Sequence, residues 1–181
     1  MSFQDKLNSV ILTKFPHISL KKKQKESLES IYNGRDTLCI LPTGYGKSLI
    51  YQMLPDLLAG DHPGIVLVIS PLNAIIEQQV KALSKLNIPA CSLSLSATVG
   101  IVEDEDSGDS DVADDSEQPL ILNAGQNLED LKAGKYTLIY GHPEAFTSRL
   151  GQEIMASSLF QERVVAIVID EAHCIKDWFV L

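Results

Sequence analysis

Apolar residues at the start of the chain recur with the spacing of an α-helix. Ser2 and Asp5 stand where a helix N-cap and its N3 acid lie, so this pattern predicts a helix that ends before Pro16. A second helix is expected around Leu28, and Gly34 stops it. The apolar positions of the two helices are Phe3, Leu7, Val10, Ile11 and Phe15, then Leu28, Ile31 and Tyr32.

Beyond Gly34, short apolar runs alternate with longer periodic segments. The runs predict strands and the periodic segments predict helices. Strands are expected at 37–41, 65–70, 136–141 and 164–169, and helices at 47–59 and 72–86. Because parallel strands are joined by crossover helices, this alternation predicts an α/β fold with a parallel sheet flanked by helices on both faces.

Length and composition are those of one ordinary domain: 181 residues, of which 45% are hydrophobic. Nine of the 24 acidic residues lie between positions 103 and 117, where there is no Lys or Arg. The rest of the chain carries 15 acidic and 15 basic residues, so the net charge of −9 does not exclude a polyanionic partner such as nucleic acid.

The acidic residues belong to a segment, 100–119, made mainly of Asp, Glu, Ser and Gly. Such a composition cannot bury enough apolar surface to offset the entropy of ordering, so we expect a disordered surface insert. The alternative is an acidic lure for a basic partner, or a switch phosphorylated on Ser107, Ser110 or Ser116.

The sequence predicts an intracellular, soluble protein without a membrane partner. Its longest apolar stretch, 164–169, is far shorter than the roughly 20 residues that cross a bilayer, and the N-terminus lacks the features of a secretory signal. Cys39, Cys91 and Cys174 are far apart and have no Cys-x-x-Cys spacing. We therefore expect them to be core thiols rather than disulfide partners or zinc ligands.

A loop with two glycines, between the first predicted strand and the next helix, is typical of a phosphate-binding site. Gly44 and Gly46 allow the backbone to turn its amide N–H groups toward phosphate oxygens. Lys47 would reach the β- and γ-phosphates, and Ser48 would offer a hydroxyl to Mg²⁺. The loop departs from the strict Gly-x-x-x-x-Gly-Lys-[Ser/Thr] pattern at its first position, and a chance glycine turn is the alternative. It consists of Leu41, Pro42, Thr43, Gly44, Tyr45, Gly46, Lys47 and Ser48.

Two acids, Asp170 and Glu171, directly follow the last predicted strand. In a parallel sheet the carboxyl ends of the strands form the edge where ligands bind. A carboxylate there can hold the Mg²⁺ hydration shell while its neighbour orients and deprotonates an attacking water. We assign Asp170 to the metal and Glu171 to the water. Two solvated acids that cap a helix are the alternative.

Together these motifs resemble those of superfamily 2 helicases, which have Pro-Thr-Gly-x-Gly-Lys-Ser and then Asp-Glu-x-His. The resemblance is closest to RecQ-type DNA helicases and extends over about 20–178, interrupted by the acidic insert. The stretches that carry it are 42–52, 68–72, 140–144 and 170–175, with Trp178. It implies a single RecA-like P-loop NTPase domain over 1–181, which binds ATP and Mg²⁺ and carries an adenine-recognition motif within helices 1–33.

The resemblance also implies roles for individual residues. Gln24 resembles the glutamine that recognises the adenine edge, and Lys21 stands where an Arg is usual; Phe15 or His17 would supply a stacking ring. Thr43 and Tyr45 would line the nucleotide with the rest of their loop. Contacts with single-stranded or forked DNA would involve Ser70, Pro71 and His142, and Trp178 would sense the DNA. The lysines at 21, 22, 23 and 25 form a local positive cluster, either a solvated helix face or a phosphate contact.

Helicases of this type hydrolyse ATP between two lobes, the second of which supplies arginines. The 181 residues contain motifs of the first lobe alone, so we expect this chain to bind Mg-ATP and to hydrolyse it slowly if at all. The leading hypothesis is the ATP-binding lobe of a 3′-to-5′ DNA helicase acting in nuclear DNA repair and recombination. The alternatives are a non-catalytic nucleotide- and DNA-binding module, or a lobe of another superfamily 2 translocase that acts on RNA or chromatin.

Overall fold

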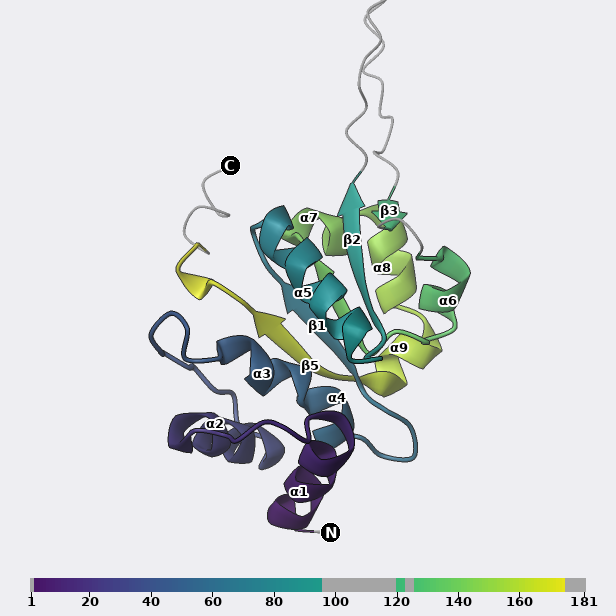
Figure 1. Cartoon of the computed structure of the whole chain (residues 1–181). Coiled ribbons are helices and arrows are strands. Elements are labelled where there is room, and N and C mark those ends of the chain that lie inside the picture. Colours follow the sequence, from purple (N-terminus) through teal and green to yellow (C-terminus); the bar gives the residue numbers. More distant parts are fainter. Residues whose placement is uncertain (1, 96–119, 123–125, 175–181) are drawn as a thin grey trace, which may run out of the picture.

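The computed structural model describes residues 2–95, 120–122 and 126–174, which form one sheet with helices on both faces (Figure 1). In these residues the sheet has five strands in the order β3-β2-β4-β1-β5. They are β1 (Ile65–Ile69), β2 (Ala90–Leu95), β3 (Leu120–Leu122), β4 (Leu138–Gly141) and β5 (Val164–Ile169). Four strands run parallel and β3 runs antiparallel to β2. The predicted α/β class and parallel sheet are confirmed, and β2 and β3 are strands that the sequence analysis did not predict.

Alternate residues of β1 face two separate cores, as the period of a strand requires. Val66 and Val68 pack with α1 to α5, whereas Ile65 and Leu67 pack with α6 to α9. The helices are α1 (Phe3–Lys14), α2 (Lys22–Tyr32), α3 (Lys47–Gln52), α4 (Leu54–Leu57), α5 (Asn73–Lys85), α6 (Leu128–Lys132), α7 (Pro143–Thr147), α8 (Arg149–Met155) and α9 (Ser158–Arg163), and a 3₁₀ turn follows at Ala172–Cys174.

The two N-terminal helices begin and end where local signals predict. Ser2 and Asp5 form a reciprocal capping box at the start of α1, with the Asp5 N–H donating to Ser2 Oγ at 3.2 Å. The Ser2 side chain and backbone lower the pKa of the Asp5 carboxyl. Gly34 follows α2 with a φ of +73°, a conformation that costs glycine little.

The single helix predicted over 47–59 is wrong, because the segment divides into α3 and α4 at Met53. Pro55 lies just beyond the break. It has no N–H to donate to the carbonyl four residues earlier, so a continuous helix would lose a hydrogen bond and crowd the proline ring. The same segment still buries Ile50, Tyr51, Met53, Leu54 and Leu57.

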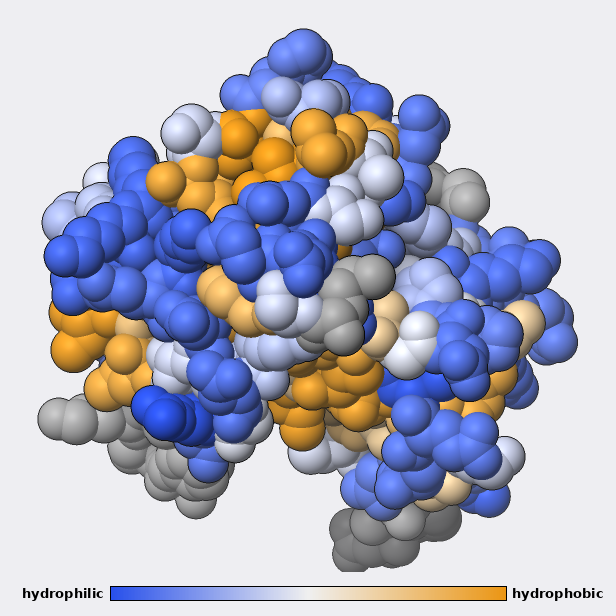
Figure 2. Space-filling model, turned by 90° about the horizontal axis from the view of Figure 1, so that it is seen from below, coloured by the Kyte–Doolittle hydropathy of each residue, from blue (hydrophilic) through white to orange (hydrophobic). Residues whose placement is uncertain are grey.

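The strand predicted at 37–41 is also wrong: this segment belongs to no helix or strand. A strand needs a neighbour for its backbone hydrogen bonds, and within the described residues β5 pairs with β1 alone. Leu38 and Ile40 are therefore 79% and 85% exposed. Figure 2 shows a face of the molecule on which hydrophobic residues form separate patches among hydrophilic ones.

Candidate nucleotide-binding site

The predicted phosphate-binding loop is a turn that leads into α3. The Tyr45 N–H donates to the Pro42 carbonyl at 3.1 Å and closes the turn. Gly44 and Gly46 adopt φ values of +77° and +92°, in the left-handed region that favours glycine. Both glycines and Thr43 are exposed, so a ligand can reach the loop backbone. Lys47 turns its ammonium back toward the loop and donates to the Leu41 carbonyl at 3.4 Å.

Gln24 lies against this loop and is only 3% exposed. Its Oε1 accepts a hydrogen bond from the Lys21 N–H at 2.8 Å. Its Nε2 donates to the carbonyls of Tyr45 and Gly46, at 3.2 and 2.9 Å. This amide orientation satisfies every neighbour, and it uses both N–H groups of the side chain. The candidate adenine-recognition residue thus acts as a clamp on the loop.

Lys21 and Tyr45 complete this side of the loop. The Lys21 Nζ lies 4.5 Å from the centroid of the Tyr45 ring and donates to the Tyr45 carbonyl at 3.2 Å. Of the two candidate stacking rings, Phe15 is buried in the core, whereas His17 is exposed. The structure therefore brings Lys21, Gln24 and Tyr45 together and leaves His17 as the accessible ring of the two.

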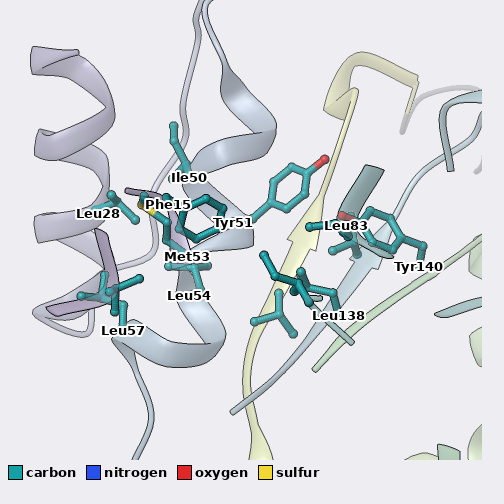
Figure 3. Packing of buried hydrophobic residues seen from close by; sticks show 14 of the residues in the cluster. Phe15, Leu28, Ile50, Tyr51, Met53, Leu54, Leu57, Leu83, Leu138 and Tyr140 are labelled. Atoms are coloured by element: carbon teal, nitrogen blue, oxygen red, sulfur yellow. The ribbon is translucent and has the colours of Figure 1, made fainter. Parts of the chain in front are cut away.

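The candidate metal ligands are Ser48 on α3 and Asp170 at the end of β5, and Tyr51 of α3 contacts Asp170. Its hydroxyl donates to Asp170 Oδ2 at 3.0 Å across 119 positions of sequence. Burial raises the pKa of Tyr51 far above its ordinary value, the neighbouring Tyr140 and Asp170 raise it further, and a hydrogen bond with Ser48 partly opposes this. The hydroxyl therefore keeps its proton and can donate. Figure 3 shows Tyr51 extending from α3 toward β5.

Oxygen donors such as the Ser48 hydroxyl and the Asp170 carboxylate suit Mg²⁺, which takes its remaining ligands from phosphates and water. Across residues 2–95, 120–122 and 126–174, no group of three or more His, Cys, Asp or Glu side chains could hold a metal ion. The donor chemistry of Ser48 and Asp170 fits a Mg²⁺ ion that takes its other ligands from phosphates and water.

Glu171 follows the metal candidate in a strained conformation. Its φ is +54°, which is uncommon for a residue with a side chain and often marks a functional site. Its Oε2 lies 3.2 Å from His173 Nδ1, and the two side chains are 31% and 76% exposed. The Glu171 carboxylate is therefore partly accessible to water. Because solvent reaches both side chains, their interaction is weak.

The candidate DNA contacts lie at the carboxyl ends of two neighbouring strands, β1 and β4. His142 Nε2 and Asn73 Oδ1 are 2.7 Å apart, so the residue that follows β4 contacts the first residue of α5. Ser70, however, is 2% exposed, its N–H donates to the Gly141 carbonyl, and its hydroxyl has no hydrogen-bond partner among the described residues. Pro71 is partly exposed. The exposed polar surface of these loops therefore comes from His142 and Asn73 rather than from Ser70.

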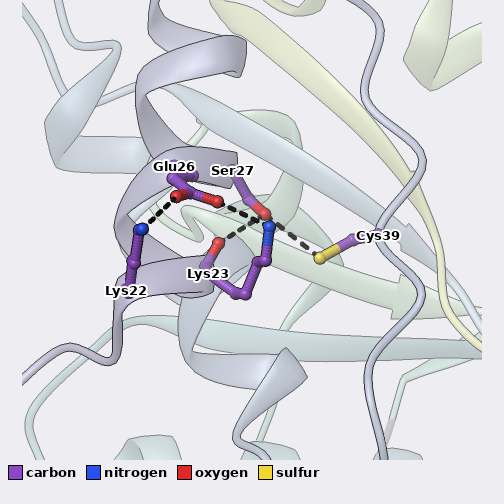
Figure 4. Close-up of polar contacts among 5 residues, drawn as sticks. All are labelled: Lys22, Lys23, Glu26, Ser27 and Cys39. Atoms are coloured by element: carbon purple, nitrogen blue, oxygen red, sulfur yellow. Dashed lines mark hydrogen bonds and ion pairs between the residues drawn. The ribbon is translucent and has the colours of Figure 1, made fainter.

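Two of the four clustered lysines are paired on α2 (Figure 4). Lys23 and Lys22 lie 2.9 and 3.8 Å from the carboxylate of Glu26. The hydrogen bond to Glu26 raises the pKa of Lys23, and the same bond lowers the pKa of Glu26. The pairing reduces the positive field of the cluster and favours a solvated helix face. Trp178 and the acidic insert 100–119 lie outside the described residues.

Three residues that the sequence analysis did not single out support the site. Besides Tyr51, Gln79 on α5 donates to Ser48 Oγ at 3.4 Å and accepts from Gln52 Nε2 at 2.8 Å. Tyr51 and Gln52 belong to the stretch 42–52 that carries the family resemblance, which was a usable signal. Gln79 is one of several polar residues on an amphipathic helix, and nothing in its spacing distinguishes it.

In the described part of the chain, no helix is long and apolar enough to cross a membrane.

Comparison with known proteins agrees with these motifs. Residues 21–180 match the DEAD/DEAH box helicase family. The chain is 32% identical over 166 residues to the ATP-dependent DNA helicase hus2/rqh1 of Schizosaccharomyces pombe, and 33% identical over 174 residues to the ATP-dependent DNA helicase RecQ of Haemophilus influenzae. It is 32% identical over 181 residues to the probable ATP-dependent DNA helicase RecS of Bacillus subtilis.

These alignments cover 91%, 94% and 96% of this chain but 11%, 23% and 29% of the three relatives. The chain thus spans less than a third of the length of each. Since the family match includes the P-loop and the acids that follow β5, on an α/β fold of the RecA-like kind, the chain belongs to the DEAD/DEAH box helicases and is similar to their RecQ-type members.

Proposed function

We propose that this chain is the ATP-binding lobe of a RecQ-like DNA helicase, in which ATP hydrolysis drives movement along single-stranded DNA. The hydrogen bond between Tyr51 and Asp170 is the observation that supports this most directly. It joins the helix that follows the P-loop to the acids at the end of β5. Two motifs that are far apart in sequence therefore share one edge of the sheet, where parallel α/β folds bind ligands.

On the phosphate side of this proposal, Lys47 and the loop backbone from Thr43 to Gly46 bind the β- and γ-phosphates. Ser48 and Asp170 hold Mg²⁺, which when bound neutralises negative charge on the phosphates. Glu171 accepts a proton from the attacking water, a role that suits its accessible carboxylate.

On the base side, Gln24 and Lys21 recognise adenine. Because both N–H groups of the Gln24 amide bind loop carbonyls, the side chain must release one of them to donate to adenine. Nucleotide binding is then coupled to a change in the loop. Tyr45 stays under the Lys21 ammonium and limits how far the loop can open.

On the DNA side, the loops that carry Ser70, Pro71 and His142 track the backbone of a single strand, and Trp178 senses it. Action at forks, the 3′-to-5′ direction and a role in nuclear DNA repair and recombination rest on the resemblance to RecQ-type enzymes. A second lobe would complete the site with arginines, which in related reactions accelerate hydrolysis by about 10³- to 10⁵-fold. This chain alone is therefore expected to bind Mg-ATP and to turn it over slowly.

The test is Mg-ATP binding and steady-state hydrolysis by the 181-residue chain, with single-stranded DNA, with RNA and with neither. Lys47→Ala should abolish nucleotide binding, whereas Glu171→Gln should retain binding and lose any turnover. Turnover stimulated by DNA and lost in Glu171→Gln supports the proposal. DNA and nucleotide binding with turnover no greater than that of Glu171→Gln means that the chain by itself is non-catalytic, and stimulation by RNA alone favours a different translocase. A chain that does not bind nucleotide refutes the proposal.

A further inference from the structure

Tyr51 links the helix that carries one candidate metal ligand to the other candidate ligand. Its side chain is 5% exposed, and its hydroxyl donates to Asp170 Oδ2 at 3.0 Å. Ser48 lies one turn earlier on α3, whereas Asp170 lies at the end of β5. The phenol thus reaches from α3 to the Asp170 carboxylate.

Asp170 is held at each of its carboxylate oxygens. Oδ1 accepts from the Glu171 N–H at 3.0 Å, and Oδ2 accepts from Tyr51 at 3.0 Å. Each oxygen keeps one further acceptor site, which can bind a water of the Mg²⁺ shell. Two anchors on one carboxylate restrict its rotation, so the orientation of its free acceptor sites is set before any ligand arrives.

The ring of Tyr51 is supported independently of its hydroxyl. It packs edge-on against Tyr140 with 6.3 Å between centroids, inside the core that α3 shares with β1 and β4. A phenylalanine at this position can keep that packing and lose only the hydrogen bond to Asp170. An experiment can therefore test the role of the hydroxyl without changing the packing of the ring.

We propose that Tyr51 is a positioning residue, whose hydroxyl orients Asp170 for a Mg²⁺–nucleotide complex; this rests on the nucleotide site proposed above. Groups that orient metal ligands typically contribute about 10- to 100-fold to metal affinity. The hydroxyl should therefore strengthen nucleotide binding when Mg²⁺ is present and leave metal-free binding unchanged.

The experiment measures the dissociation constant of a fluorescent ATP analogue with excess Mg²⁺ and with excess EDTA, for wild type, Tyr51→Phe and Tyr140→Phe. Tyr140→Phe is the matched control, because it removes a neighbouring buried hydroxyl that has no hydrogen-bond partner among the described residues. Thermal unfolding of each protein shows that all three are folded.

We expect Tyr51→Phe to reduce the gain in affinity from Mg²⁺ about tenfold while its affinity in EDTA matches wild type. Tyr140→Phe should retain the full gain. An unchanged Mg²⁺ gain in Tyr51→Phe, or an equal loss in both variants, overturns the proposal and leaves the nucleotide site standing. A wild-type chain that binds no nucleotide under either condition refutes the nucleotide site itself.

Discussion

Replacement of Gln24 should destabilise the protein even when no nucleotide is bound. The side chain is 3% exposed and makes three hydrogen bonds, one with the Lys21 N–H and two with loop carbonyls. At a net value of about 1 kcal/mol each, Gln24→Ala loses about 3 kcal/mol. Gly46 is exposed, so water can replace part of the loss at the loop. We therefore expect the free energy of unfolding to fall by about 2 kcal/mol, a large share of the roughly 5–15 kcal/mol typical of a domain.

The isosteric variant Gln24→Glu sharpens this test. It keeps the acceptor that faces the Lys21 N–H but replaces the amide donor with an oxygen that faces two carbonyl oxygens. A buried carboxylate in that position is unfavourable, so Gln24→Glu should be at least as unstable as Gln24→Ala near neutral pH. Its pKa in the folded protein would lie above its unfolded value, so the native state binds more protons and the deficit should shrink as the pH falls.

The measurement is urea unfolding followed by circular dichroism, with no nucleotide added. Gln78→Ala provides the control, because it shortens an exposed glutamine on α5 and should change stability by less than about 0.5 kcal/mol. If both Gln24 variants unfold like wild type and lose only affinity for ATP, the side chain serves the ligand alone and the clamp described above is wrong.

Three further predictions concern other parts of the fold. Gly46→Ala should lower the free energy of unfolding by at least about 1–2 kcal/mol, because the φ of Gly46 is +92° and a Cβ there would lie 2.6 Å from Gln24 Nε2. Gly60 has open space around it, so Gly60→Ala should leave the free energy of unfolding unchanged. We expect the chain to self-associate through β5 at high concentration, because Ile167 is 64% exposed on this strand, whose pairing among the described residues is with β1 alone. Ile167→Lys should reduce this association in sedimentation velocity, and a wild-type chain that stays monomeric, or a variant that associates equally, refutes the expectation. Ser2→Ala should weaken the acid sensitivity of α1. Ser2 depresses the pKa of Asp5 from its ordinary 3.8, so its contribution is complete above that value and is lost as the pH falls through and below it; parallel stability-against-pH curves for variant and wild type would contradict this.

Local signals in the sequence were sufficient for much of the fold. The capping box at Ser2, the stop at Gly34 and the strand 164–169 depend on residues that are neighbours along the chain, and all three were predicted correctly. The carboxyl ends of parallel strands lie at the same edge of a sheet. The acids that follow the strand 164–169 were therefore expected at the edge where ligands bind.

Pairing between distant segments was decided by the tertiary structure. The apolar run at 37–41 has the composition of a strand, yet it forms none because no described strand lies beside it. Ser94 and Leu95 in β2 are one polar and one apolar residue, too short a pattern to predict a strand. The segment is a strand because it pairs with β4 on one side and with β3 on the other.

The same distinction holds within the site. Sequence identified Lys47, Ser48, Asp170 and Glu171 as residue types suited to phosphate, metal and water. It did not indicate that Gln24 would clamp the loop or that Tyr51 would reach Asp170. Those contacts depend on how α2, α3 and β5 are arranged in space. A side-chain hydrogen bond forms only within about 3 Å of its partner, and no periodicity along the chain encodes that distance.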